Sequence, residues 1–104
     1  MDERQASILA EYQIEVEGLL SEINVGEDGE HLWDNYQRVT SVIFRLSQLH
    51  NDIGNLEISG TDWPEIKRFR TLIIDPTIES LQRVAAFESR KITGRQLEKD
   101  LEKF

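Results

Sequence analysis

A long row of apolar side chains at helical spacing, in the middle of the chain, constrains the fold more than any other feature. Between residues 32 and 53 this row advances by alternating steps of four and three, the spacing of one helix face. A second row follows one flank at steps of seven. Two adjacent rows predict a helix over about 31–53 that contacts more than one neighbour and is central to a bundle. The first row is Leu32, Tyr36, Val39, Ile43, Leu46, His50 and Ile53, and the second is Val42, Leu49 and Leu56.

The segment before this helix has the same spacing. Its apolar residues occupy about a third of the circumference, as in a helix packed on one face, and they predict a helix over about 3–24. Residues 24–30 contain two glycines and no periodicity, which indicates a loop. The residues that form the stripe of this first helix are Ile8, Tyr12, Val16, Leu19 and Ile23.

Clear signals mark a third helix. Asp62 is a suitable N-cap, Glu65 completes a capping box, and Pro64 lies in the first turn, where no backbone donor is needed. Pro76 lacks a backbone N–H and its ring clashes with the preceding turn, so we expect a break or strong kink there, with Asp75 as a new N-cap. The residues expected to face inward before this point are Ile66, Phe69, Leu72 and Ile73.

Apolar residues continue at helical spacing beyond Pro76 to about residue 91. Thr93 with Gln96 then forms a second capping box, which predicts a short final helix carrying Leu97, Leu101 and Phe104. No stretch alternates as a strand does. The sequence therefore predicts an all-α fold, a single helical domain over 1–104 built as a small helical bundle of three long helices, the third broken at Pro76, plus a short C-terminal helix. The inward residues after Pro76 are Ile78, Leu81, Val84, Ala85 and Ile92.

Charge and composition exclude several classes of function. The net charge of −8 argues against nucleic-acid binding through phosphate neutralisation. No apolar run approaches the length of a membrane helix, and the first residues lack the pattern of a signal peptide, so we expect no membrane contact and a cytoplasmic protein. The absence of cysteine fits a reducing compartment. The charge is also uneven, because residues 1–30 carry nine acids and one base, whereas residues 63–104 carry seven acids and nine bases.

Catalytic and metal-binding motifs are missing from the sequence. A carboxylate-bridged di-metal bundle needs two Glu-x-x-His pairs, and the two histidines of this chain do not stand in that spacing. Residues 24–31 resemble a calcium loop only in composition, since their acids are not at alternate positions. We therefore expect no metal, no cofactor and no enzymatic activity.

His50 is the polar member of an otherwise apolar or aromatic row, and three interpretations are open. It can lie near the helix C-terminus, where imidazole bonds the last free carbonyls and a positive charge is favoured. It can also lie in a seam between two copies of the chain, where its protonation would weaken assembly. The third interpretation is a metal or catalytic role.

Acidic residues of the first helix and basic residues of the third suggest two alternatives. Glu11, Glu15 and Glu22 lie beside the apolar stripe of the first helix, whereas residues 67–70 include Lys67, Arg68 and Arg70. The two groups can simply set the pairing of these helices, at a few tenths of a kcal/mol for each exposed pair. Alternatively, the acidic face stays open for a basic partner, which electrostatic attraction would help to bind.

These observations favour a non-enzymatic protein–protein interaction or adaptor protein that self-associates as a homodimer through the central or the C-terminal helix. The alternative is an acidic inhibitor of a basic protein, of the immunity type or a nucleic-acid mimic, acting through the first helix and residues 22–30. A small-molecule enzyme is the third possibility. The candidate partner-binding residues are Glu11, Glu15, Glu22, Glu27, Asp28, Glu30, Trp33, His50, Leu97, Leu101 and Phe104.

Overall fold

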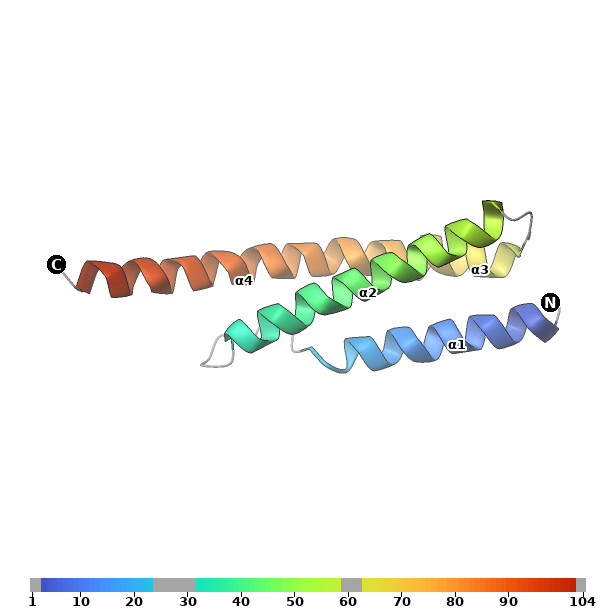
Figure 1. The fold of residues 1–104 in the computed structure, drawn as a ribbon, viewed down its shortest axis with the longest axis horizontal. Coiled ribbons are helices and arrows are strands. Elements are labelled where there is room, and N and C mark those ends of the chain that lie inside the picture. The colour runs from blue at the N-terminus through green and yellow to red at the C-terminus, as the bar shows by residue number, and fades with distance from the viewer. Residues whose placement is uncertain (1–2, 24–31, 59–62, 103–104) are drawn as a thin grey trace.

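The described part of the chain is all-α, as predicted, and outside the helices it contains only residues 21–23 and Trp63. The computed structural model describes residues 3–23, 32–58 and 63–102, and no strand occurs among them. Three helical rods are visible in Figure 1, because the last three elements follow one another without a gap. The elements are α1 (Glu3–Leu20), α2 (Leu32–Ile58), α3 (Pro64–Phe69), the π-helical turn η1 (Arg70–Ile74) and α4 (Asp75–Glu102).

The molecule is long and thin, with extents of 65 × 23 × 16 Å. The central helix α2 lies between α1 and α4, and it makes its most extensive contact with α4 (Figure 1). The C-terminal part of α4 continues beyond the beginning of α2 (Figure 1). This end of α4 therefore has fewer helical neighbours than the rest of the protein.

One face of α2 provides most of the core. Its buried residues recur at alternating steps of three and four, which is the spacing of a helix packed against its neighbours along a heptad seam. The central position of α2 is confirmed, but the buried row is displaced from the expected one: Tyr36, Ile43 and His50 lie half-buried at its edge. We call the buried row the α2 seam, and it comprises Leu32, Asn35, Val39, Val42, Leu46, Leu49 and Ile53.

The first helix packs on the core through the stripe that its sequence predicts. Val16 is buried, and the other members of the stripe are partly buried against the core. The helix ends at Leu20, earlier than expected, where the Ser21 hydroxyl donates a hydrogen bond to the Gly18 carbonyl. The last turn then tightens, because the Glu22 and Ile23 N–H groups donate to carbonyls three residues back.

The irregularity expected at Pro76 takes the form of a π-helical turn, and the rod is not broken. The Asp75 N–H donates to the Arg70 carbonyl, five residues earlier. In an α-helix, a proline ring clashes with the carbonyl of the residue four positions earlier, which for Pro76 is Leu72. Leu72 lies in the π-helical turn, which is wider than an α-helical turn. Asp75 has helical backbone angles, so it continues the rod and does not cap a new helix.

This turn also changes which residues face the core. Ile66 and Phe69 are buried, as predicted, but the inward orientation expected for Leu72 and Ile73 is wrong, since both are exposed. Ile74 is buried in their place. The reason is that a π turn contains one more residue than the α-helical turn from which the inward positions were predicted.

Both ends of the third rod differ in detail from the expected capping. Asp62 is outside the described residues, and Trp63 holds the N-cap position without a capping side-chain hydrogen bond. At the other end, Thr93 lies inside α4, where its hydroxyl donates to the Ser89 carbonyl four residues back. The C-terminal segment is therefore helical, as predicted, but it is continuous with α4 and does not begin a separate helix at Thr93.

Candidate functional site

The predicted acidic residues of α1 do not form one free surface. Glu11 and Glu22 are exposed, but Glu15 accepts a hydrogen bond from Arg45 Nε of α2 at 2.6 Å. The pairing of Glu15 is thus with α2 and not with the basic residues of α3. Glu27, Asp28 and Glu30 lie outside the described residues.

The Tyr12 hydroxyl lies near carboxylates of both α1 and α2. Partial burial raises the pKa of the Tyr12 hydroxyl above its usual value of about 10, and the carboxylates of Asp52, Glu15 and Glu11 raise it further. Both causes disfavour the phenolate form. The carboxylates of Asp52, Glu15 and Glu11 therefore lie close enough to the Tyr12 hydroxyl to oppose its ionisation.

The raised pKa of Tyr12 predicts a loss of stability at alkaline pH. The unfolded chain releases the tyrosine proton near pH 10, before the folded chain does, so the contribution of Tyr12 is complete below pH 10 and is lost as the pH rises through the folded-state pKa. Urea unfolding of the wild type and of Tyr12→Phe at pH 8 and above pH 10 measures this. At the higher pH, the free energy of unfolding of Tyr12→Phe should rise relative to that of the wild type. An unchanged difference between the two proteins would contradict a raised pKa of Tyr12.

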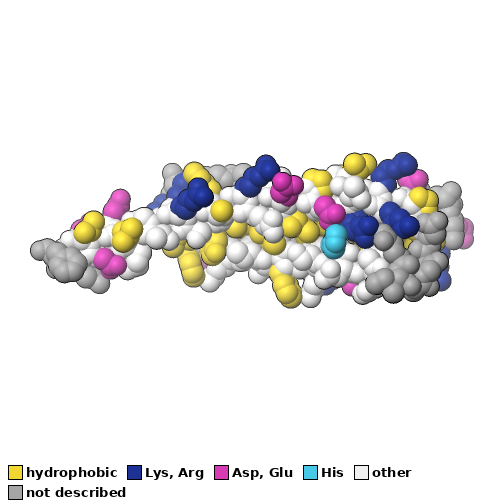
Figure 2. Space-filling model, turned by 90° about the horizontal axis from the view of Figure 1, so that it is seen from above, with side chains coloured by type: hydrophobic (Ala, Val, Ile, Leu, Met, Phe, Trp, Pro, Cys, Tyr) yellow, Lys and Arg dark blue, Asp and Glu magenta, His cyan; other side chains and the backbone are white. Residues whose placement is uncertain are grey.

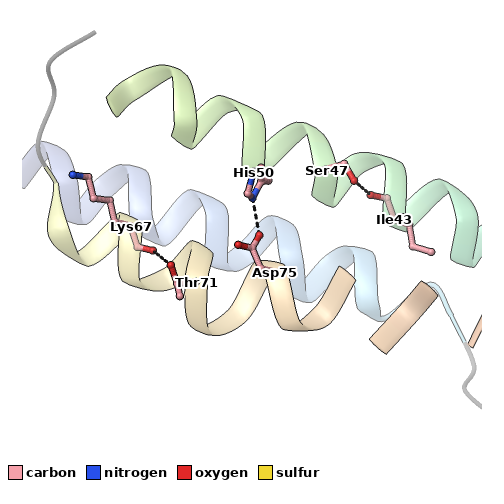
Figure 3. A network of polar contacts seen from close by, with 6 residues as sticks. All are labelled: Ile43, Ser47, His50, Lys67, Thr71 and Asp75. Carbon is pink, nitrogen blue, oxygen red and sulfur yellow. Dashed lines mark hydrogen bonds and ion pairs between the residues drawn. The ribbon is translucent and has the colours of Figure 1, made fainter. Parts of the chain in front are cut away.

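His50 lies within α2, about two turns before the helix ends at Ile58, so the helix C-terminus interpretation is wrong. Its ring Nδ1 is 2.6 Å from Asp75 Oδ1, and both side chains are partly exposed. Figure 3 shows this contact joining α2 to the beginning of α4. The Nδ1 atom of His50 is therefore paired within its own chain.

A surface hollow of about 280 Å³ adjoins the His50–Asp75 contact. Its lining combines one imidazole and two carboxylates with the apolar Ile78. An enzyme site for a small molecule would need titratable and apolar groups together in this way. Among residues 3–23, 32–58 and 63–102, no group of three or more metal-ligating side chains is assembled. The residues that line the hollow are Ser47, His50, Asn51, Asp75, Ile78, Glu79 and Gln82.

A buried polar pair joins α2 to α4, and the sequence analysis missed both of its members. Asn35 Nδ2 donates to Glu88 Oε2 at 3.0 Å, and each residue is only 2% exposed. Glu88 Oε1 has no hydrogen-bond partner in the described part of the chain. Both residues stand seven positions from buried apolar residues, Val42 and Leu81, and this heptad spacing was the available signal.

Trp33 is half exposed at the beginning of α2. Its ring is 5.8 Å from that of Tyr36 and tilted by 32°. Trp33 also borders a hollow between the beginning of α2 and the last turns of α4, so these two parts of the sequence meet there. The α4 residues in this hollow are Ile92, Arg95, Gln96 and Lys99.

An exposed apolar surface lies on the side of α4 away from α2. Phe87, Leu97 and Leu101 are 56%, 58% and 70% exposed. Leu97 follows the buried Glu88 by nine residues, which is about two and a half helical turns, so the two side chains leave α4 on opposite sides. We call this surface the outer face of α4, and it comprises Phe87, Arg90, Gly94, Leu97 and Leu101.

The outer face of α4 brings together two of the predicted candidates, Leu97 and Leu101, whereas Phe104 lies outside the described residues. Sequence reasoning missed Phe87 and Gly94, although Phe87, Gly94 and Leu101 stand exactly one heptad apart. Figure 2 shows hydrophobic side chains at the surface along the molecule, including its projecting end. Clustered exposed apolar side chains of this kind mark interaction surfaces.

Comparison of the chain with protein-family models, curated proteins and solved structures finds no match. Within the described helices, none has the length and hydrophobicity needed to cross a membrane. The function is therefore argued from the geometry of the chain itself.

Proposed function

We propose that this protein is a non-enzymatic protein–protein interaction or adaptor protein that binds its partner through the outer face of α4. The observation that carries the proposal is the exposure of Phe87, Leu97 and Leu101, each more than half, on the side of α4 that faces away from α2. Burying large apolar side chains is the main favourable term in association, and aromatic side chains are enriched where binding energy concentrates. The lack of cysteine fits action in the cytoplasm.

A helix presented in this way suits the binding of another helix. The five positions of the outer face recur at alternating steps of three and four, which is the pattern that one helix offers to another, and Phe87, Leu97 and Leu101 are its large apolar members. Arg90 lies among these apolar positions and Lys91 and Glu98 flank them, so that charged groups border an apolar centre. This arrangement is typical of protein interfaces.

The alternative function, an acidic inhibitor of a basic protein, is supported by a different observation. The exposed Glu11 and Glu22, together with the raised pKa of Tyr12, describe a negative surface on α1. Such a surface speeds the association of a basic partner and makes binding fall with salt. The pairing of Glu15 with Arg45 weakens this alternative, because one of the three predicted carboxylates is already satisfied.

Affinity capture from an extract of the source cell tests the proposed function. Leu101→Glu places a charge on the outer face without disturbing the core, because Leu101 is 70% exposed. We expect this variant to lose at least about 90% of the specifically captured partner, which corresponds to a tenfold or larger loss in affinity.

Ile14→Glu is the matched control, since Ile14 is 69% exposed on α1 and receives the same charge. This control should capture the partner as the wild type does. Circular dichroism should show equal helicity in all three proteins. Capture that is undiminished in Leu101→Glu would refute a role for the outer face. Capture that is undiminished in both variants and abolished by salt would favour the acidic-inhibitor alternative, because binding through opposite charges falls with salt.

A further inference from the structure

We infer that the partner at the outer face of α4 is a second copy of this chain, bound antiparallel with the twofold axis at Gly94. This inference rests on the proposed function, because it names the occupant of the same surface. Three observations carry it: a glycine that its own chain does not require, apolar residues placed symmetrically around it, and opposite charges placed symmetrically around it.

Gly94 lies in the interior of α4, at a cost in helix stability of about 1 kcal/mol relative to alanine. A Cβ atom built at Gly94 meets no atom of the described residues within 4 Å apart from its own turn of helix, so the packing of these residues does not explain the glycine. A second helix crossing at this point would explain it, because a missing side chain lets two helix backbones approach closely. Leu97 of each chain would then fill the space beside the partner's Gly94.

Two of the three large apolar residues of the outer face are arranged symmetrically about Gly94. Phe87 precedes it by seven residues and Leu101 follows it by seven. In an antiparallel pair centred on Gly94, each residue is opposite one that is equally far from the centre in the other direction. Phe87 therefore packs against the partner's Leu101, and the twofold axis repeats this contact, as an isologous dimer requires.

The charges select the antiparallel orientation. Arg90 precedes Gly94 by four residues and Glu98 follows it by four, so Arg90 lies opposite the partner's Glu98 and the pair occurs twice. A parallel pair in the same register would place arginine opposite arginine and glutamate opposite glutamate, and like charges in register oppose association. Lys91, whose Nζ is 4.5 Å from the Phe87 ring centre, flanks the apolar contact with its aliphatic stem.

The rest of the fold leaves room for this partner. Leu81 and Glu88 face α2 from the opposite side of α4, and α1 packs on α2 and α3. A contact between two single helices is small for a protein interface, so we expect a dimer that forms at micromolar concentrations.

Sedimentation equilibrium of the wild type and of Gly94→Lys tests the location of the axis. Lysine favours a helix more than glycine does, so the monomer should stay folded with equal or greater helicity. In the dimer, however, two lysines meet at the axis, and we expect the dissociation constant to rise at least tenfold. Gly18→Lys is the matched control, because an added Cβ at Gly18 on α1 also meets nothing within 4 Å. A wild type that is monomeric at high micromolar concentration, or a Gly94→Lys variant that dimerises normally, overturns the inference.

Single cysteines test the orientation, since the chain contains none of its own. A disulfide needs Cα atoms closer than about 7 Å. Gly94→Cys should form a homodimeric disulfide under mild oxidation, whereas Arg90→Cys and Glu98→Cys should each remain reduced alone and form a heterodimeric disulfide when mixed. Efficient homodimeric cross-linking of Leu101→Cys would instead indicate a parallel pair and overturn the inference.

These results separate the inference from the proposed function. If the wild type is monomeric but Leu101→Glu still loses a captured heterologous protein, the second copy is refuted and the interaction function stands. If Leu101→Glu captures every partner normally, the proposed function fails as well.

Discussion

Replacing Asn35 with leucine should lower the free energy of unfolding by about 3 kcal/mol, at the upper end of the cost of leaving a buried polar group without its hydrogen-bond partner. Asn35 Nδ2 is the donor to Glu88 Oε2, and Glu88 Oε1 accepts no hydrogen bond within the described residues. Since Glu88 is 2% exposed, water does not replace the lost donor. Urea unfolding followed by circular dichroism at pH 7 measures the effect.

A double-mutant cycle provides the control for this prediction. Glu88→Leu should cost less than Asn35→Leu, because a buried amide is less costly than a buried carboxyl group that has lost its hydrogen-bond donor. The double variant with leucine at both positions should recover most of the stability, since replacing a buried polar pair by apolar residues is often neutral or stabilising. Strictly additive losses would show that the two side chains do not act as a pair.

Leu46→Ala is expected to lower the free energy of unfolding by about 3–4 kcal/mol, within the range of leucine-to-alanine changes in well-packed cores. Leu46 is at the middle of the α2 seam and is fully buried. The molecule is thin, so few other residues are placed to fill the cavity. Because domains of this size are stable by only about 5–15 kcal/mol, this single change should remove a large share of the stability.

Phe44→Ala, two residues away on the same helix, is the matched control for Leu46→Ala. Phe44 is 66% exposed, so its removal should change stability by less than about 0.5 kcal/mol. Urea unfolding of both variants under one set of conditions makes the comparison. Equal losses at the two positions would show that α2 is rotated about its axis relative to the orientation described here.

Much of the fold follows from helical periodicity, which explains why the all-α class and the central position of α2 were predictable. The buried face of α2 was not fully predictable, because the prediction used only the spacing of apolar residues and Asn35 is polar. The α2 seam passes through Asn35, and the predicted row passed instead through Tyr36 one position later. A polar residue in a core is identified only by its partner, and Glu88 is 53 positions away in the sequence.

The partner of His50 was hidden for the same reason. Asp75 is 25 residues away, and its position before a proline indicated an N-cap instead of a contact with α2. Pro76 located the irregularity correctly. A proline does not determine whether a helix responds by breaking, kinking or widening, since this depends on what packs around the turn, and here the result was a widened turn that exposes Leu72 and Ile73.

The candidate surface was partly predictable. Leu97 and Leu101 follow from the amphipathic spacing of residues 94–104. Phe87 could not be assigned to the same surface while the last helix was expected to begin at Thr93, because two separate helices need not share a face. The continuity of α4 is what places Phe87, Gly94 and Leu101 in line.

The π-helical turn determines the direction in which this surface points. Each residue of an α-helix advances by about 100° around the axis, so one extra residue in η1 rotates everything beyond it by about that amount relative to α3. The π-helical turn therefore sets the rotation of α4 about its axis relative to α3. The helix α3 packs on α1, whereas α4 directs Glu88 toward α2 and its apolar side outward. The direction in which the outer face of α4 points is thus determined by the turn Arg70–Ile74, several helical turns before Phe87, the first residue of that face.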